Sequence, residues 1–161
     1  MLVDSVHLEF GKLTVLQSAF VTSERGKVTG VLGRNGTGKS CLFKCIMGGI
    51  KPQNIFVRFN DEQSTDYGHI GDRVKYLPQN LFMPPRMTLD EAFRLYDVEY
   101  DGLVSFDPKF HTFQKKQFRE LSGGEARVAE MFIIIKSPSD FCILDEPFSN
   151  IALFMSRRCS R

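Results

Sequence analysis

Eight consecutive residues in the first third of the chain combine three glycines with a lysine and a serine. They are Gly33-Arg34-Asn35-Gly36-Thr37-Gly38-Lys39-Ser40, and they fit the phosphate-loop (P-loop) pattern in full. Glycines let successive backbone N–H groups turn inward on an anion, and a helix that follows offers the positive end of its dipole to the same anion. Lys39 supplies a point charge for the β- and γ-phosphates, and the Ser40 hydroxyl suits a Mg²⁺ ligand. The segment therefore predicts binding of Mg²⁺ with ATP or a close relative, with Cys41 as the last contact; a glycine-rich turn without a ligand is the alternative.

Two carboxylates follow a short apolar run near the C-terminus. Phe141-Cys142-Ile143-Leu144 precedes Asp145 and Glu146, and four apolar residues ending on acids are typical of a buried parallel strand. Beside a P-loop, Asp145 can hold the Mg²⁺ shell and Glu146 can polarise the attacking water of a hydrolysis reaction. Without the P-loop, the pair would be an ordinary pair of surface acids.

The elements that must position these groups can be predicted in outline. A short buried strand over Lys27–Leu32 should lead into the glycine loop, and the apolar spacing over Lys39–Gly48 predicts a helix after it. Further strands are predicted at Val3–Phe10 and Leu13–Val21, which should form a hairpin across Gly11-Lys12, and at Ile55–Phe59 and Val74–Leu77.

The middle of the chain changes character after Gln79. Thr88 and Glu91 have the spacing of a capping box, and apolar residues with helical spacing follow, so Asn80–Glu120 is predicted to be a mostly helical insert. Gly124–Ile135 should form another helix. The small basic run Lys115, Lys116, Arg119 is interpreted as a solvated helix face without function.

Composition limits the classes of protein to consider. With 161 residues, 42% hydrophobic and 25% charged, we expect one globular domain. A net charge of +2, with both signs interspersed, argues against a protein that holds nucleic acid mainly through its phosphates. The sequence has no signal-peptide pattern and no bilayer-length apolar run, so a cytoplasmic location is expected. Cys41 and Cys45 could form half a metal site on a helix, but no second pair completes it, and reduced thiols are expected.

A third motif points to a family. Leu121-Ser122-Gly123-Gly124-Glu125 is the signature sequence of ABC ATPases, and its spacing to Asp145 resembles theirs. The resemblance implies that Ser122, Gly123 and Gly124 bind the nucleotide held by the P-loop of a second cassette, either a second copy of this chain or a different one, and that separate transmembrane subunits move the substrate. It also makes Gln79 the Q-loop glutamine that contacts Mg²⁺ and the attacking water, and Phe10 the ring that stacks on adenine. No nucleic-acid partner is implied, and the protein would be peripheral to the inner face of a membrane.

The resemblance implies an α/β fold, a three-layer P-loop NTPase sandwich with an N-terminal antiparallel β element and a helical insert. One ABC-type domain would fill residues 1–161, with its core at about 1–79 and 121–161 and the insert at about 80–120.

Family members continue with a D-loop aspartate and a later switch histidine, whereas here Ser149-Asn150-Ile151 precedes Ala152 and no histidine follows Glu146. The residues from Phe154 to Arg161 look like a tail, so we expect a truncated form in which nucleotide binding survives better than catalysis. The hypotheses are an ATPase subunit of a transporter, a nucleotide-binding module without turnover, and a soluble ABC ATPase that does not act in transport.

Overall fold

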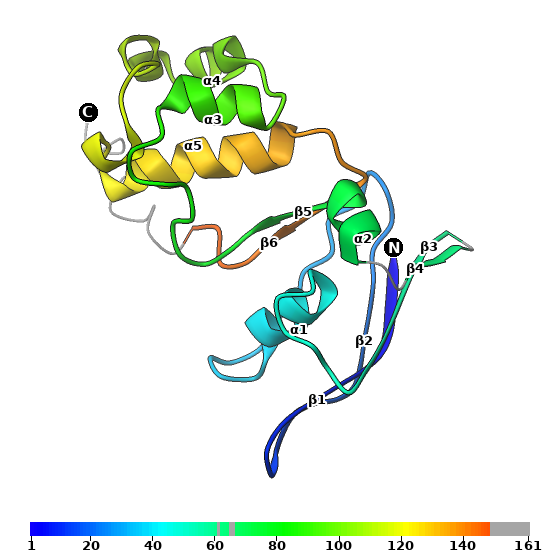
Figure 1. Cartoon of the computed structure of the whole chain (residues 1–161). Coiled ribbons are helices and arrows are strands. Elements are labelled where there is room, and N and C mark those ends of the chain that lie inside the picture. The colour runs from blue at the N-terminus through cyan, green and yellow to red at the C-terminus, as the bar shows by residue number, and fades with distance from the viewer. Residues whose placement is uncertain (61, 65–66, 149–161) are drawn as a thin grey trace. The chain divides into compact units, whose positions relative to one another are not determined.

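The computed structural model describes residues 1–60, 62–64 and 67–148 (Figure 1). The predicted D-loop segment Ser149-Asn150-Ile151 and the tail after it lie outside the described residues. The structure divides into two compact units. The first unit contains Met1–Val74 and Ser139–Ile143, and the second unit contains Lys75–Pro138 with the described residues from Leu144 onward.

An antiparallel sheet forms most of the first unit. Its strands lie in the order β2-β1-β3-β4 and have the bounds β1 Leu2–Phe10, β2 Leu13–Thr22, β3 Asn54–Phe59 and β4 Glu62–Ser64. The predicted hairpin is confirmed: Phe10 pairs with Leu13, and Gly11 between them has a φ of 62°, which suits a two-residue hairpin turn. The predicted strand at Ile55–Phe59 is confirmed as β3.

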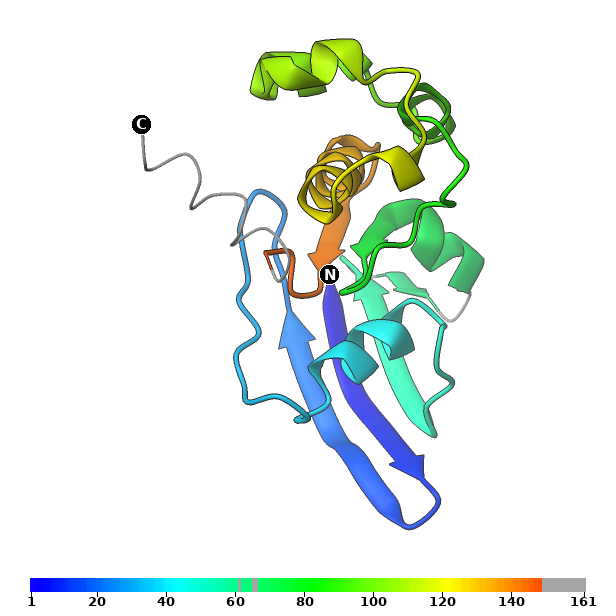
Figure 2. The ribbon, with the colours of Figure 1, turned by 90° about the vertical axis from the view of Figure 1, so that its left-hand side faces the viewer.

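Helix α1, Lys39–Ile46, lies across this sheet and contacts β1, β2 and β3 (Figure 2). The predicted helix is confirmed, and its buried side chains Leu42, Cys45 and Ile46 form one face. The same unit contains the helix α2, Tyr67–Arg73. The glycine loop is therefore attached to a helix that is itself anchored on a sheet.

The segment Lys27–Leu32 differs from its prediction. It has no regular secondary structure, Val28 is 100% exposed and Leu32 is 94% exposed. A central strand depends on hydrogen-bonded neighbours, and neither sheet in the described part of the chain includes this segment. The prediction of a buried strand was wrong because the composition of a strand does not supply the ladder that it needs.

Helices dominate the second unit. They are α3 Leu89–Leu95, α4 Tyr100–Phe106 and α5 Gly123–Lys136, with the 3-10 turns η1 Pro108–Thr112 and η2 Phe118–Glu120. Thr88 and Glu91 form the predicted capping box at the start of α3. One apolar cluster holds these elements together, with members from α3, α4, both turns and α5, among them Phe93, Leu103 and Ile133. The helices predicted after Gln79 are thus present and packed on α5.

Two short strands pair with each other in a second sheet: β5, Val74–Leu77, and β6, Phe141–Leu144. Both have the bounds that the sequence predicted. Within the second unit, Asp145 N donates to Leu77 O at 2.9 Å. This bond places the residue after β6 beside the end of β5.

Candidate functional site

The glycine loop of the first unit depends on two glycines in a left-handed backbone conformation. Gly36 has a φ of 83° and Gly38 a φ of 92°, a region that residues with a Cβ enter only with strain. A Cβ on Gly38 would also lie 3.0 Å from Leu16 Cδ2 and 3.1 Å from Val15 Cγ1. Gly38 is the N-cap of α1, and its carbonyl accepts from Leu42 N at 2.8 Å. The loop therefore turns directly into the N-terminus of a helix, as the motif predicted.

Lys39 closes the loop by bonding to its backbone. Its ammonium donates to Gly33 O at 2.8 Å and to Arg34 O at 3.0 Å. Thr37 Oγ1 donates to the same Arg34 carbonyl at 2.9 Å. An ammonium group has three donors, so a third remains for an anion beside the loop. Ser40 follows Lys39 in the first turn of α1.

Two other predicted residues of this unit lie at the surface or close to it. Cys41 is half-buried on α1. Phe10 ends β1 with 52% of its surface exposed. An exposed ring is free to stack on a planar ligand, and the adenine contact stays a prediction.

The second unit brings Gln79 and Glu146 together. Gln79 Nε2 donates to Glu146 Oε2 at 2.9 Å, and both side chains are exposed. Glu146 has a φ of 46°, a left-handed conformation that is uncommon for a residue with a side chain. An exposed carboxylate held in one orientation by an amide donor has the geometry of a group that can polarise water.

Asp145 differs from its neighbour in burial. It is 2% exposed, and its carboxylate accepts from the Tyr76 hydroxyl at 3.1 Å. Burial, together with the charge of Asp145, raises the pKa of the Tyr76 phenol well above its ordinary value. The phenol therefore stays protonated and remains a donor to Asp145. The sequence did not reveal Tyr76, because no local pattern links it to Asp145 at a separation of 69 positions.

The signature residues begin helix α5. Ser122 is its N-cap: Ser122 Oγ accepts from Glu125 N at 3.3 Å, and Glu125 Oε2 accepts from Ser122 N at 2.9 Å. Burial opposes ionisation of Glu125, but the bonds from Ser122 and the nearby ammonium of Lys109 lower its pKa overall. A carboxylate in the first turn of a helix suits the dipole there. Gly123 has open space where a Cβ would stand, so its backbone is accessible to a ligand.

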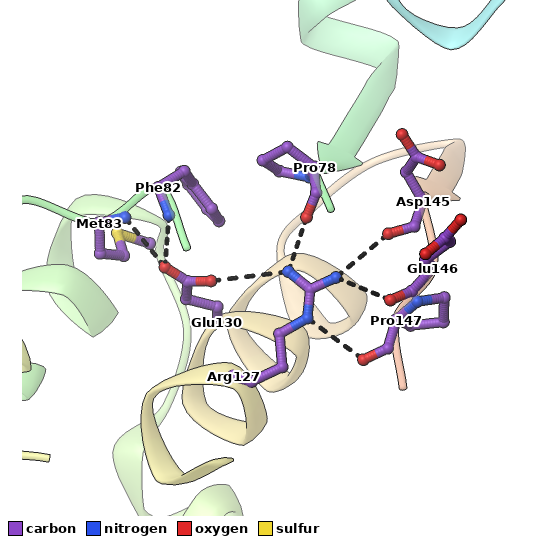
Figure 3. Close-up of polar contacts among 8 residues, drawn as sticks. All are labelled: Pro78, Phe82, Met83, Arg127, Glu130, Asp145, Glu146 and Pro147. Carbon is purple, nitrogen blue, oxygen red and sulfur yellow. Dashed lines mark hydrogen bonds and ion pairs between the residues drawn. The ribbon is translucent and has the colours of Figure 1, made fainter. Parts of the chain in front are cut away.

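Sequence reasoning missed a buried ion pair one turn further along α5. Arg127 and Glu130 are both 0% exposed, and their charged groups lie 3.8 Å apart (Figure 3). Their spacing of three residues on one helix was the available signal, since opposite charges three residues apart are neighbours and ionised side chains are rarely fully buried unless they are paired.

Comparison with known proteins gives the family. A family model described as ABC transporter matches residues 16–149. The zinc import ATP-binding protein of Photobacterium profundum is 31% identical, over 92% of this chain and 56% of its own length. The petrobactin import ATP-binding protein of Bacillus subtilis is 26% identical, over 92% of this chain and 65% of its own. The chain thus spans less than two thirds of the length of these relatives.

A solved ATP-binding subunit of an ABC transporter has the same fold. It superimposes with a TM-score of 0.74 over 96% of this chain and 71% of its own, at 20% identity. Among the described residues, no helix combines the length and the apolar character needed to cross a bilayer. The match of the family model over most of the sequence, with the α/β P-loop fold, shows that the chain belongs to the ABC transporter ATP-binding family.

Proposed function

We propose that this chain binds Mg-ATP at Gly33–Ser40 and hydrolyses it as the ATP-binding subunit of an ABC transporter. The observation that carries the proposal is the loop itself. Gly36 and Gly38 have the positive φ values that turn a backbone around an anion, and Lys39 is bonded to the loop carbonyls next to the N-terminus of α1. Such a loop provides N–H groups, a helix dipole and a fixed ammonium for phosphate oxygens.

The remaining predicted residues have distinct roles in this proposal. Ser40, Gln79 and Asp145 would hold the Mg²⁺ that accompanies the nucleotide, since hydroxyl, amide and carboxylate oxygens are its preferred ligands. Glu146 would polarise the attacking water with Gln79 beside it. Phe10 would stack on adenine.

The assembly is also part of the proposal. Ser122, Gly123 and Gly124 would bind the γ-phosphate of a nucleotide held by a second cassette, so that two cassettes enclose two nucleotides. Separate transmembrane subunits would couple closure to transport and would keep the chain at the inner face of the membrane. The relatives named as zinc import and petrobactin import proteins support a role in transport. As part of the same proposal, residues 1–161 form a single ABC-type domain with a helical insert at about 80–120.

A second candidate is a nucleotide-binding module with little turnover. The segment Lys27–Leu32, which belongs to neither sheet of the described residues and has Val28 and Leu32 exposed, leads directly into the P-loop. Catalysis needs reacting groups held more precisely than binding does. A phosphate loop that follows a segment outside any strand would therefore lose turnover before it loses affinity for the nucleotide.

Thermal unfolding with and without excess Mg-ATP tests binding. Ligand at about 100 times its Kd stabilises a protein by about 2.7 kcal/mol, which for a chain of this size raises the unfolding temperature by roughly 5 to 10 °C. Lys39→Ala should abolish the shift, because the ammonium that meets the phosphates is gone.

Lys44→Ala is the matched control, since Lys44 is an exposed lysine of the same helix. A shift that survives Lys39→Ala would contradict binding at the P-loop. Phosphate release by the wild type then separates the two candidates: a shift with turnover supports the ATPase, and a shift without turnover supports the binding module.

A further inference from the structure

Arg127 is a fully buried side chain that bonds to four backbone carbonyls. Nη1 donates to Pro78 O at 2.6 Å, and Nε donates to Pro147 O at 3.2 Å (Figure 3). Nη2 donates to Asp145 O at 3.2 Å and to Glu146 O at 3.3 Å. The planar guanidinium presents donors in a rigid fork. One side chain of α5 thereby joins the end of β5 to three successive carbonyls after β6.

The four carbonyls flank the only two predicted catalytic residues of this unit. Pro78 directly precedes Gln79, and the other three carbonyls belong to Glu146 and to its neighbours on both sides. Gln79 and Glu146 are themselves joined by the 2.9 Å side-chain hydrogen bond. Because both side chains are exposed, packing around them does not explain how they keep their positions relative to each other. The fixed part is the backbone on either side, and that backbone is bonded to Arg127.

The backbone of Glu146 needs such support. Its φ of 46° lies in the left-handed region, and conformations of this kind persist only where the surroundings over-determine them. Three of the four bonds from Arg127 go to the carbonyls of Asp145, Glu146 and Pro147. These three hydrogen bonds therefore hold the backbone at the residue whose φ is strained.

Glu130 supplies the charge that allows Arg127 to be buried. Its Oε2 lies 3.8 Å from Arg127 Nη1, and its Oε1 accepts from Phe82 N at 2.8 Å and from Met83 N at 2.9 Å. Burial raises the pKa of Glu130, while these N–H groups and the Arg127 charge act in the opposite direction. Removing one member of a buried pair leaves an uncompensated charge. Glu130 thus anchors Arg127 and ties the same network to the chain that follows Gln79.

We propose that Arg127 is a positioning residue that holds Gln79 and Glu146 in their reactive arrangement through the carbonyls beside them, with Glu130 as its anchor. The inference rests on the proposed function in that Glu146 is taken to act on the attacking water. A buried apolar side chain could fill the same volume, but it could not bond to four carbonyls. The positioning role therefore requires the several donors of the guanidinium group, and a positive charge alone would not suffice.

The test replaces the fork and keeps the charge. In Arg127→Lys, the ¹⁵N-resolved side-chain amide signal of Gln79 should move to its position in Glu146→Ala, where the bond has no acceptor. Turnover of Mg-ATP should fall roughly 100-fold, as expected for a misplacement of about 1 Å, while KM stays within about twofold of the wild type. Arg119→Lys, at an exposed arginine of η2, is the matched control and should change neither readout.

A folded Arg127→Lys protein with an unmoved Gln79 amide signal overturns the proposal. If that variant does not fold, Gln79→Ala and Glu146→Ala serve instead, since both change exposed side chains. They should shift the Arg127 Nε–H signal of the otherwise intact protein, because energetic coupling within one network is mutual. An unmoved Nε–H signal in both overturns the proposal equally. The spectra need no turnover, so failure of the ATPase activity is seen separately from failure of the positioning role.

Discussion

At the scale of single residues, Glu146 combines an exposed carboxylate with a strained backbone. A left-handed residue other than glycine costs on the order of 1 to 3 kcal/mol, and such outliers gather at functional sites. The bond from Gln79 leaves the second carboxylate oxygen of Glu146 available to a water molecule. The strain is therefore consistent with a residue kept for chemistry and not for stability.

Replacing Glu146 with glutamine tests this role. Glu146→Gln keeps the shape of the side chain and an oxygen that can accept from Gln79, but it removes the base. Phosphate release from Mg-ATP should fall about 10²- to 10⁴-fold, the usual contribution of a general base, while the thermal shift caused by Mg-ATP remains. Glu99→Gln, at an exposed glutamate of the second unit, should leave the rate unchanged. Unaltered phosphate release in Glu146→Gln would exclude Glu146 as the base.

Motif spacing could predict the candidate residues for ligand contact, but not the residues that hold them in place. Gln79 and Glu146 lie 67 positions apart, were predicted separately, and form a hydrogen bond in the structure. The spacing of Arg127 and Glu130 suggests that they pair, but it does not reveal their other partners, which are backbone carbonyls and N–H groups of distant segments. Tyr76 was missed for a related reason, since its bond to Asp145 depends on the pairing of β5 with β6.

At the scale of elements, the first turn of α1 and the glycine loop form one structural piece. The φ of Gly38 fixes the direction in which the loop enters the helix, and Val15 and Leu16 of β2 pack against the place where a Cβ would stand. Because Gly38 has no side chain, β2 packs directly against the junction of the loop and α1. The packing of α1 on the sheet therefore also constrains the loop.

Gly38→Ala should therefore destabilise the protein as well as weaken binding. We expect a loss of about 1 to 3 kcal/mol in the free energy of unfolding, from the strained φ and the contacts with β2. Urea-induced unfolding followed by circular dichroism measures it. Gly30→Ala is the control, because a Cβ there meets nothing within 4 Å and no positive φ applies. Equal stability of the two variants would show that the loop conformation is not constrained.

The elements that could be predicted are those whose signals are local. Capping boxes, turn residues and short apolar runs gave the start of α3 at Leu89, the β1–β2 hairpin, and the bounds of β5 and β6. Lys27–Leu32 has the same kind of composition and is not a strand. A strand in the middle of a sheet is stabilised by its neighbours, and no local pattern states whether those neighbours are present.

At the scale of the whole molecule, the chain has the family's motifs for two different sides of a nucleotide. The P-loop belongs to the first unit and the signature to the second. In the proposed assembly, each would serve a different nucleotide, so a single copy would hold only half of each complete site. Assembly and nucleotide binding should therefore be linked.

Mg-ATP should convert the Glu146→Gln variant from a monomer to a dimer, because blocked hydrolysis preserves the state in which two cassettes enclose the nucleotides. Light scattering coupled to size exclusion should give twice the mass of a single chain when nucleotide is in excess. Lys39→Ala added to the same variant should remain at the mass of one chain. A single-chain mass at saturating Mg-ATP would contradict pairing of identical cassettes and would leave a different cassette as the partner to be sought.

The exposed stretch before the P-loop also makes the chain vulnerable to cleavage. Proteases and aggregating chains both engage a polypeptide as an added strand, through its unpaired N–H and C=O groups. Lys27 is exposed and is followed by Val28, whose surface is entirely open, in a segment without regular secondary structure, so trypsin can reach its basic residue. A single cut there would detach the β1–β2 hairpin from the covalent chain that contains the phosphate loop. The lifetime of the intact chain during proteolysis would then depend on how far that short stretch is covered.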